Sequence, residues 1–168
     1  YLINESINLG RGTIMFWFQP RWSGDDPVGQ YTLFWLTMRG SQKYFAIHRS
    51  FNPQDPLALY MNLQWDSVIQ TTTASHFHPG EWIHIALTWD KEQKNFSAYF
   101  DGDLVGTAVW PDVVEEADYI PETLKLGLYY QGEGEDSPIN ASYDELFIFD
   151  GPLSATEIGA YIEETSKE

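Results

Sequence analysis

Apolar and polar residues alternate along Glu81–Gly106 in a pattern that predicts three consecutive β-strands. In Ile83–Trp89 every second side chain is a large apolar one, which is the period of a strand buried on one face. The polar turn Asp90–Lys94 separates this run from a second alternating run, Phe96–Phe100. The pair Asp101-Gly102 follows, and it tolerates the positive φ of a tight hairpin turn. Because isolated hairpins are marginal in water, one face of this meander requires a second sheet across it.

Similar runs elsewhere in the chain predict further strands, about a dozen in total with the three above. Loops rich in glycine, proline and acidic residues separate them at Arg21–Gln30, Trp110–Pro121 and Gly132–Asp136. This arrangement predicts an all-β fold, an antiparallel jelly-roll β-sandwich. The additional strands are expected at Ile3–Leu9, Thr13–Gln19, Tyr31–Met38, Lys43–Arg49, Leu57–Trp65, Ser67–Thr73, Leu124–Leu128 and Ala141–Phe149.

After Pro152 the apolar period changes to that of a helix. Ser154 and Glu157 fit a capping box, in which each side chain satisfies a backbone donor of the other residue. An apolar stripe follows on one side, so we expect a short C-terminal helix that closes one side of the sandwich. The stripe consists of Leu153, Ile158, Tyr161 and Ile162.

The charge balance narrows the choice of partners, since 25 acidic against 9 basic residues give a net charge of −16. Such a field repels phosphate backbones and anionic lipid headgroups, so nucleic acid and membrane surfaces are poor partners. The absence of cysteine removes disulfides, thiol nucleophiles and thiolate metal sites. At 168 residues the chain fits one domain over 1–168. Its start at Tyr1 rather than Met favours a piece of a longer protein.

Five motifs resemble, in the family's order, those of the laminin G-like, concanavalin A-like domains. They are Gly12–Pro20, Trp82–Asp90, Tyr99–Gly102, Tyr143–Phe149 and Leu153–Ile158. The resemblance spans nearly the whole chain and implies two curved antiparallel sheets. It also implies an extracellular or cell-surface module that binds glycans or proteins, but it does not fix the ligand.

The same superfamily contains glycoside hydrolases, which the residues of the last strand argue against. Retaining hydrolysis needs two carboxylates about 5–5.5 Å apart, which on a strand means acidic residues at alternate positions of one face. The positions two residues after Asp144 and Glu145 are Leu146 and Phe147, both apolar. This strand therefore lacks the carboxylate pair.

A polysaccharide lyase would need a base beside a group that neutralises a uronate, and His48, Arg49, Tyr60 and Asn62 could supply these. Strand parity opposes this arrangement, because it puts Arg49 on the face opposite His48. We expect a non-catalytic carbohydrate-binding or adhesion module that acts as a monomeric domain of a larger chain, with a glycan or a protein as its partner. A polysaccharide-degrading enzyme domain and a structural or protein-interaction spacer are the alternatives.

The candidate ligand-binding site follows from parity on two strands. Phe45 and Ile47 on one strand, and Leu59, Met61 and Leu63 on the other, must face the core, so the residues between them face away. If the strands are sheet neighbours, these outward residues form one patch of aromatic rings and amide edges, suited to stacking on sugar rings and bonding hydroxyl groups. An ordinary half-polar sheet face is the alternative. The patch comprises Tyr44, His48, Tyr60, Asn62 and Gln64, with the loop residues Trp22 and Trp110 as exposed aromatic walls.

A structural calcium ion is a further expectation, and it rests on the resemblance. Where this family holds an ion, it tends to use a carboxylate near the start of the domain and an aspartate in the last strand. Asp144 fits the second position and Glu5 or Asn4 the first, with backbone carbonyls completing the shell. The alternative is that Asp144 only bonds loop backbone. Zinc is not expected, because His76 and His78 lack further ligands and His84 is expected to be a hydrogen-bonded scaffold residue.

Overall fold

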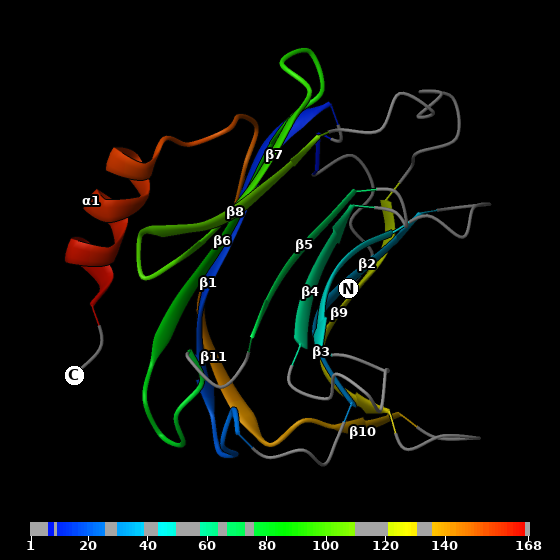
Figure 1. The fold of residues 1–168 in the computed structure, drawn as a ribbon, viewed down its shortest axis with the longest axis vertical. Helices are drawn as coiled ribbons and strands as arrows, with labels where there is room; N and C mark the ends of the chain where they lie inside the picture. The colour runs from blue at the N-terminus through cyan, green and yellow to red at the C-terminus, as the bar shows by residue number, and fades with distance from the viewer. Residues whose placement is uncertain are drawn as a thin grey trace.

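The structure, a computed structural model, describes residues 7–8, 10–25, 30–38, 44–49, 58–63, 67–72, 76–109, 121–130 and 136–166. Within these ranges the chain forms eleven β-strands and one α-helix. The strands build two antiparallel sheets that face each other, and the helix lies outside one of them (Figure 1). The predicted antiparallel jelly-roll β-sandwich is confirmed.

One sheet has five strands in the order β11-β1-β6-β7-β8 and contains the predicted meander. The hairpin turn between β7 and β8 has φ values of 50° at Asp101 and 85° at Gly102, as the sequence of this pair predicts. The strands are β1 (Arg11–Pro20), β6 (Ile83–Asp90), β7 (Asn95–Phe100), β8 (Asp103–Val109) and β11 (Ala141–Phe149).

The other sheet has six strands in the order β10-β9-β2-β3-β4-β5. Its short strand β10 was not predicted, and it begins at Asp136, the last residue of an expected loop. Of the expected first strand, Ile7 and Asn8 are not in a strand, and the rest of that segment lies outside the described residues. The strands are β2 (Gln30–Met38), β3 (Tyr44–Arg49), β4 (Ala58–Leu63), β5 (Ser67–Thr72), β9 (Pro121–Tyr130) and β10 (Asp136–Pro138).

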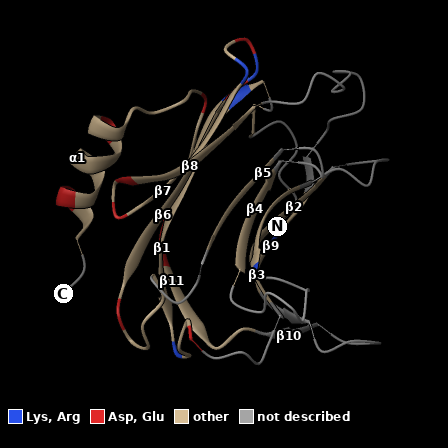
Figure 2. Cartoon of the chain, viewed as in Figure 1, with Lys and Arg blue, Asp and Glu red and all other residues tan. Residues whose placement is uncertain are grey.

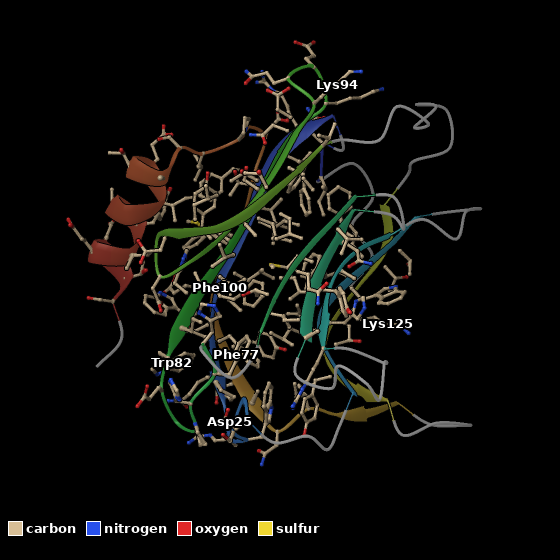
Figure 3. The ribbon with its side chains drawn as sticks, in the orientation of Figure 1. Asp25, Phe77, Trp82, Lys94, Phe100 and Lys125 are labelled. Atoms are coloured by element: carbon tan, nitrogen blue, oxygen red, sulfur yellow. The ribbon has the colours of Figure 1, made fainter. Side chains whose placement is uncertain are left out.

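The main hydrophobic core fills the space between the two sheets. Figure 3 shows Phe77 and Phe100 in this space, and both side chains are almost fully buried. Burying a large apolar side chain contributes about 1.5–3 kcal/mol, so this layer is the main source of stability. The strands supply alternate residues to it, among them Ile14, Phe16, Phe18, Phe34, Leu36, Phe45, Ile47, Leu59, Met61, Ile85, Leu87, Trp89 and Phe96.

Two further contacts connect a strand of one sheet with a strand of the other. The Tyr143 hydroxyl on β11 donates a hydrogen bond of 3.0 Å to the Leu33 carbonyl oxygen on β2. At another edge Gly106 of β8 lies against Ile69 of β5, and a Cβ on this glycine would come within 2.5 Å of the Ile69 side chain. Only glycine therefore allows β8 and β5 to approach as they do.

The helix α1 (Ala155–Thr165) covers the face of the five-stranded sheet that points away from the main core. Ser154 caps it, and the capping box with Glu157 is confirmed, since each side chain accepts a backbone N–H of the other residue. No helix in the described ranges is long and apolar enough to cross a bilayer. The predicted stripe of Leu153, Ile158, Tyr161 and Ile162 forms a second, smaller core with Met15, Ala86, Tyr99, Phe147 and Phe149.

Candidate functional site

The strands β3 and β4 are neighbours, which is the condition that the parity argument required. His48 lies opposite Tyr60, and Ala46 lies opposite Asn62. Ile47, between Ala46 and His48, belongs to the main core. His48, Tyr60 and Asn62 therefore lie together on the face of the six-stranded sheet that points away from that core.

The register of the sheet extends this face over five strands, as two rows that run across the strands. One row joins β2, β3, β4 and β5, and the other begins on β9 and crosses the same four strands. We call these nine residues the outer face. The first row is Thr32, His48, Tyr60 and Gln70, and the second is Lys125, Trp35, Ala46, Asn62 and Val68.

The aromatic part of the outer face is partly open. Tyr60 and Trp35 are half-buried, and Gln70 beside Tyr60 is exposed. The rings of His48 and Tyr60 have centroids 5.7 Å apart and planes tilted by 33°. Burial lowers the pKa of His48 to about 4, so its imidazole is neutral near pH 7. The outer face thus combines ring surfaces with neutral polar groups.

Asn62 is buried on this face without a hydrogen bond to its side-chain oxygen. Its side chain is 3% exposed, and its Oδ1 has no hydrogen-bond partner among the described residues. The residues opposite it, Ala46 and Val68, carry no polar side-chain atom. Leaving a buried acceptor unpaired costs about 1–3 kcal/mol, so an unpaired amide here stands out as a group suited to a ligand.

The structure does not describe the side chains of three predicted ligand-binding residues. Tyr44 begins β3 and pairs with Thr37, and of this residue only the backbone position is described. Gln64 and Trp110 lie outside the described residues. Their assignment to the ligand site stays a prediction.

Trp22 was expected to be exposed in a loop, and this expectation is wrong. Its side chain is 8% exposed and stacks on Tyr31 with ring centroids 4.4 Å apart. It also contacts Phe18 and Phe77 of the main core. Burying a large indole ring is favourable, and these contacts with aromatic side chains account for the burial of Trp22. Trp22 therefore lies in the main core rather than beside the outer face.

Arg49 lies on the core side of β3, as parity predicted. It is fully buried, its guanidinium carbon lies 5.7 Å from the Trp22 ring centroid, and Nη2 donates to the Gly24 carbonyl oxygen at 3.4 Å. His48, the next residue to it, faces the opposite side. The four residues considered for a lyase therefore do not come together on one face.

The sequence did not assign six members of the outer face to the site: Trp35, Thr32, Gln70, Lys125, Ala46 and Val68. Trp35 lies in a strand that is apolar on both faces, so alternation could not choose between them. In addition, the register of β2 shifts between Thr32 and Phe34. Gln70 could have been found, since it alternates with Ile69, which is 4% exposed and belongs to the core.

Asp144, the expected calcium ligand, is exposed on β11, and its Oδ1 accepts a hydrogen bond of 2.9 Å from the backbone N–H of Glu145. Glu145 has φ 50°, and the register with β1 shifts at this point. No three His, Asp or Glu side chains within the described ranges are placed to hold a metal ion. Since Glu5 lies outside these ranges, a shared ion stays a prediction.

His84 was expected to be hydrogen-bonded. Its backbone N–H has a partner, but the Nδ1 atom of its ring has none among the described residues. Its backbone N–H donates to the Asp101 carboxylate at 2.8 Å. The ring is 2% exposed, lies edge-on to Trp17 and has no partner for Nδ1 among the described residues. Burial lowers its pKa to about 4. Packing against neighbouring side chains such as Trp17, rather than a hydrogen bond to Nδ1, therefore holds the His84 ring in place.

Two facing antiparallel sheets with a polar and aromatic outer face define the chain as a lectin-like jelly roll. A laminin G family model, described as the concanavalin A-like lectin/glucanases superfamily, matches residues 2–159. The chain therefore belongs to this superfamily, which confirms the family indicated by the sequence motifs. No match was found among curated protein sequences.

Solved structures show the same fold at low sequence identity. The receptor binding domain of botulinum neurotoxin D has a TM-score of 0.71 and 14% identity over 97% of this chain and 41% of that one. Botulinum neurotoxin type C, whose cell entry depends on interaction with two ganglioside molecules, has a TM-score of 0.64 and 15% identity over 96% of this chain and 37% of that one. The sialidase of Trypanosoma rangeli has a TM-score of 0.63 and 16% identity over 92% of this chain and 23% of that one. The chain thus spans less than half the length of each.

Proposed function

We propose that the chain is a non-catalytic carbohydrate-binding module of a secreted or cell-surface protein, and that its ligand lies on the outer face. The observation that carries the proposal is the cross-strand group of Tyr60, His48 and Asn62, with the half-buried ring of Trp35 nearby. Sugar rings stack their C–H faces on aromatic planes, and amide or imidazole edges bond their hydroxyl groups. Tyr44, Gln64 and Trp110 are proposed to extend this group.

The similarity to known structures supports a binding role. A domain of the same fold is a receptor binding domain, and another belongs to a protein that interacts with gangliosides. The fold also occurs in a sialidase, so fold alone does not separate binding from catalysis. The proposal therefore depends on the residues of the outer face.

Two features favour binding over catalysis. The positions two residues after the acids of β11 are apolar, and Glu145 lies at a register shift. Arg49 faces the core and so cannot neutralise a uronate next to His48. An enzyme would have to use residues other than these candidates.

The test is a panel of soluble polysaccharides, measured both for binding and for release of reducing or unsaturated ends. Tyr60→Ala should weaken binding by roughly two- to tenfold, as expected for one stacked aromatic ring. Gln70→Ala should also weaken binding, while Gln93→Ala, an exposed glutamine in the β6–β7 turn, is the matched control and should bind normally.

Each other result favours a different function. Release of sugar ends would show an enzyme domain, and absence of both binding and release would favour a spacer or protein-interaction domain. Binding that is unchanged in Tyr60→Ala and Gln70→Ala together would move the glycan site away from the outer face.

A further inference from the structure

We propose that the outer face selects uncharged, hydroxyl-rich glycans over sulfated or uronic acid-rich ones, with the side-chain amide of Asn62 bonding a sugar hydroxyl. This inference rests on the proposed glycan-binding function and names the class of ligand. It follows from the hydrogen-bonding capacity of one buried amide and from the charges that surround it.

A ligand group that pairs with the Asn62 Oδ1 would have to be a hydrogen-bond donor, because an amide oxygen only accepts. Its Oδ1 is buried and unpaired among the described residues, and Ala46 and Val68 on either side cannot donate to it. A sugar hydroxyl both donates and accepts, so it can pair with either end of an amide. A sulfate or carboxylate only accepts near pH 7, and next to an amide oxygen it would leave that oxygen unpaired and add repulsion.

The other polar groups of the row around Tyr60 are uncharged. His48 is held neutral near pH 7 by its burial, while Thr32 and Gln70 carry a hydroxyl and an amide. A neutral imidazole, hydroxyl and amide together offer both donors and acceptors. This is the complement of a hydroxyl-bearing ring rather than of an anion.

Lys125 is the one cation of the outer face as defined, and Figure 3 shows it on the side of the six-stranded sheet away from the main core. It lies in the row of Asn62 but on β9, three strands away, which is about 14 Å at the usual strand spacing. That distance exceeds the screening length of about 8 Å at physiological salt. Over the whole chain the net charge of −16 opposes the approach of an anionic polymer.

The test uses pairs of polymers that share a backbone and differ in charge. Suitable pairs are dextran and dextran sulfate, hydroxyethyl and carboxymethyl cellulose, and methyl-esterified and free polygalacturonate. Binding is measured by affinity electrophoresis and calorimetry with the unmodified protein. For every pair with measurable binding, the uncharged polymer should bind about tenfold more tightly or better, an effect of the size expected from one unpaired polar group.

Variants then assign the preference to Asn62. Asn62→Leu should lower affinity for the uncharged polymer about tenfold and reduce the difference between the members of a pair. Asn95→Leu, at an exposed asparagine on the other sheet, is the matched control and should leave both affinities unchanged. Lys125→Gln should leave the preference for the uncharged polymer in place, because the preference is assigned to Asn62.

The outcomes separate this inference from the proposed function. Equal or tighter binding of the charged polymer would overturn the selectivity while leaving glycan binding intact, and loss of that binding in Lys125→Gln would assign it to the lysine. Absence of binding to every polymer, charged or uncharged, would overturn the proposed function as well.

Discussion

The binding role proposed for Asn62 implies a cost in stability that can be measured. Its amide is buried with an unpaired oxygen between two apolar neighbours. Asn62→Leu removes this cost without breaking a hydrogen bond to Oδ1, so it should raise the free energy of unfolding by about 1–2 kcal/mol. Urea denaturation of the variant and the parent measures this directly. A lower stability of Asn62→Leu would show that the amide has a structural role and would weaken its assignment to a ligand.

The buried histidines His48 and His84 predict a loss of stability on mild acidification. Each has a folded-state pKa of about 4 against 6.5 for the free side chain, so the unfolded chain binds protons first. Their contribution is therefore complete above pH 6.5 and is lost as the pH falls towards 4, by about 3 kcal/mol each. Urea melts at pH 7, 5.5 and 4.5 should show this fall.

Histidine variants separate this effect from the titration of carboxylates. His84→Gln and His48→Gln should each reduce the loss of stability between pH 7 and 4.5, whatever their stability at pH 7. His78→Gln, at an exposed histidine, is the control and should leave the pH dependence as it is in the parent. An unchanged pH dependence in both buried-site variants would contradict the prediction.

At the level of strands and helices, sequence periodicity was sufficient to predict an element where one of its faces is apolar and the other polar. It predicted β1, β3, β4, β6, β7 and α1 with small differences at their ends. It failed for Trp35, because β2 is apolar on both faces, and for Trp22, because a loop has no period. A third of the outer face could thus be predicted, through His48, Tyr60 and Asn62. The burial of Trp22 depends on contacts between distant segments, which no local pattern records.

The expected calcium site at Asp144 and Glu5 can be tested by thermal unfolding. If Asp144 is a ligand together with Glu5, calcium binds the native state alone and should raise the melting temperature, and a chelator should lower it. Asp144→Asn should abolish this response, while Asp150→Asn, at another exposed aspartate near the end of the same strand, should keep it. A melting curve that does not change between calcium and excess EDTA would remove Asp144 and Glu5 from the list of metal ligands.

For the whole molecule, the outward sides of the two sheets differ in the side chains that they carry. The helix α1 covers the five-stranded sheet with a second apolar cluster, while the six-stranded sheet carries aromatic and polar side chains on its outer side. Figure 2 shows acidic residues on α1 and at several strand ends, whereas most of the described strand positions are neither acidic nor basic. Despite the net charge of −16, none of the nine residues of the outer face is acidic.

The row from Lys125 to Val68 crosses five strands, so it measures about 19 Å at the usual strand spacing. A linear oligosaccharide laid along this row would gain contacts with each added sugar until its length matches that span. Beyond this length further sugars would meet no more of the row, and affinity would level off. The outer face would then act as a molecular ruler, and titration with a size series of oligosaccharides would read its length.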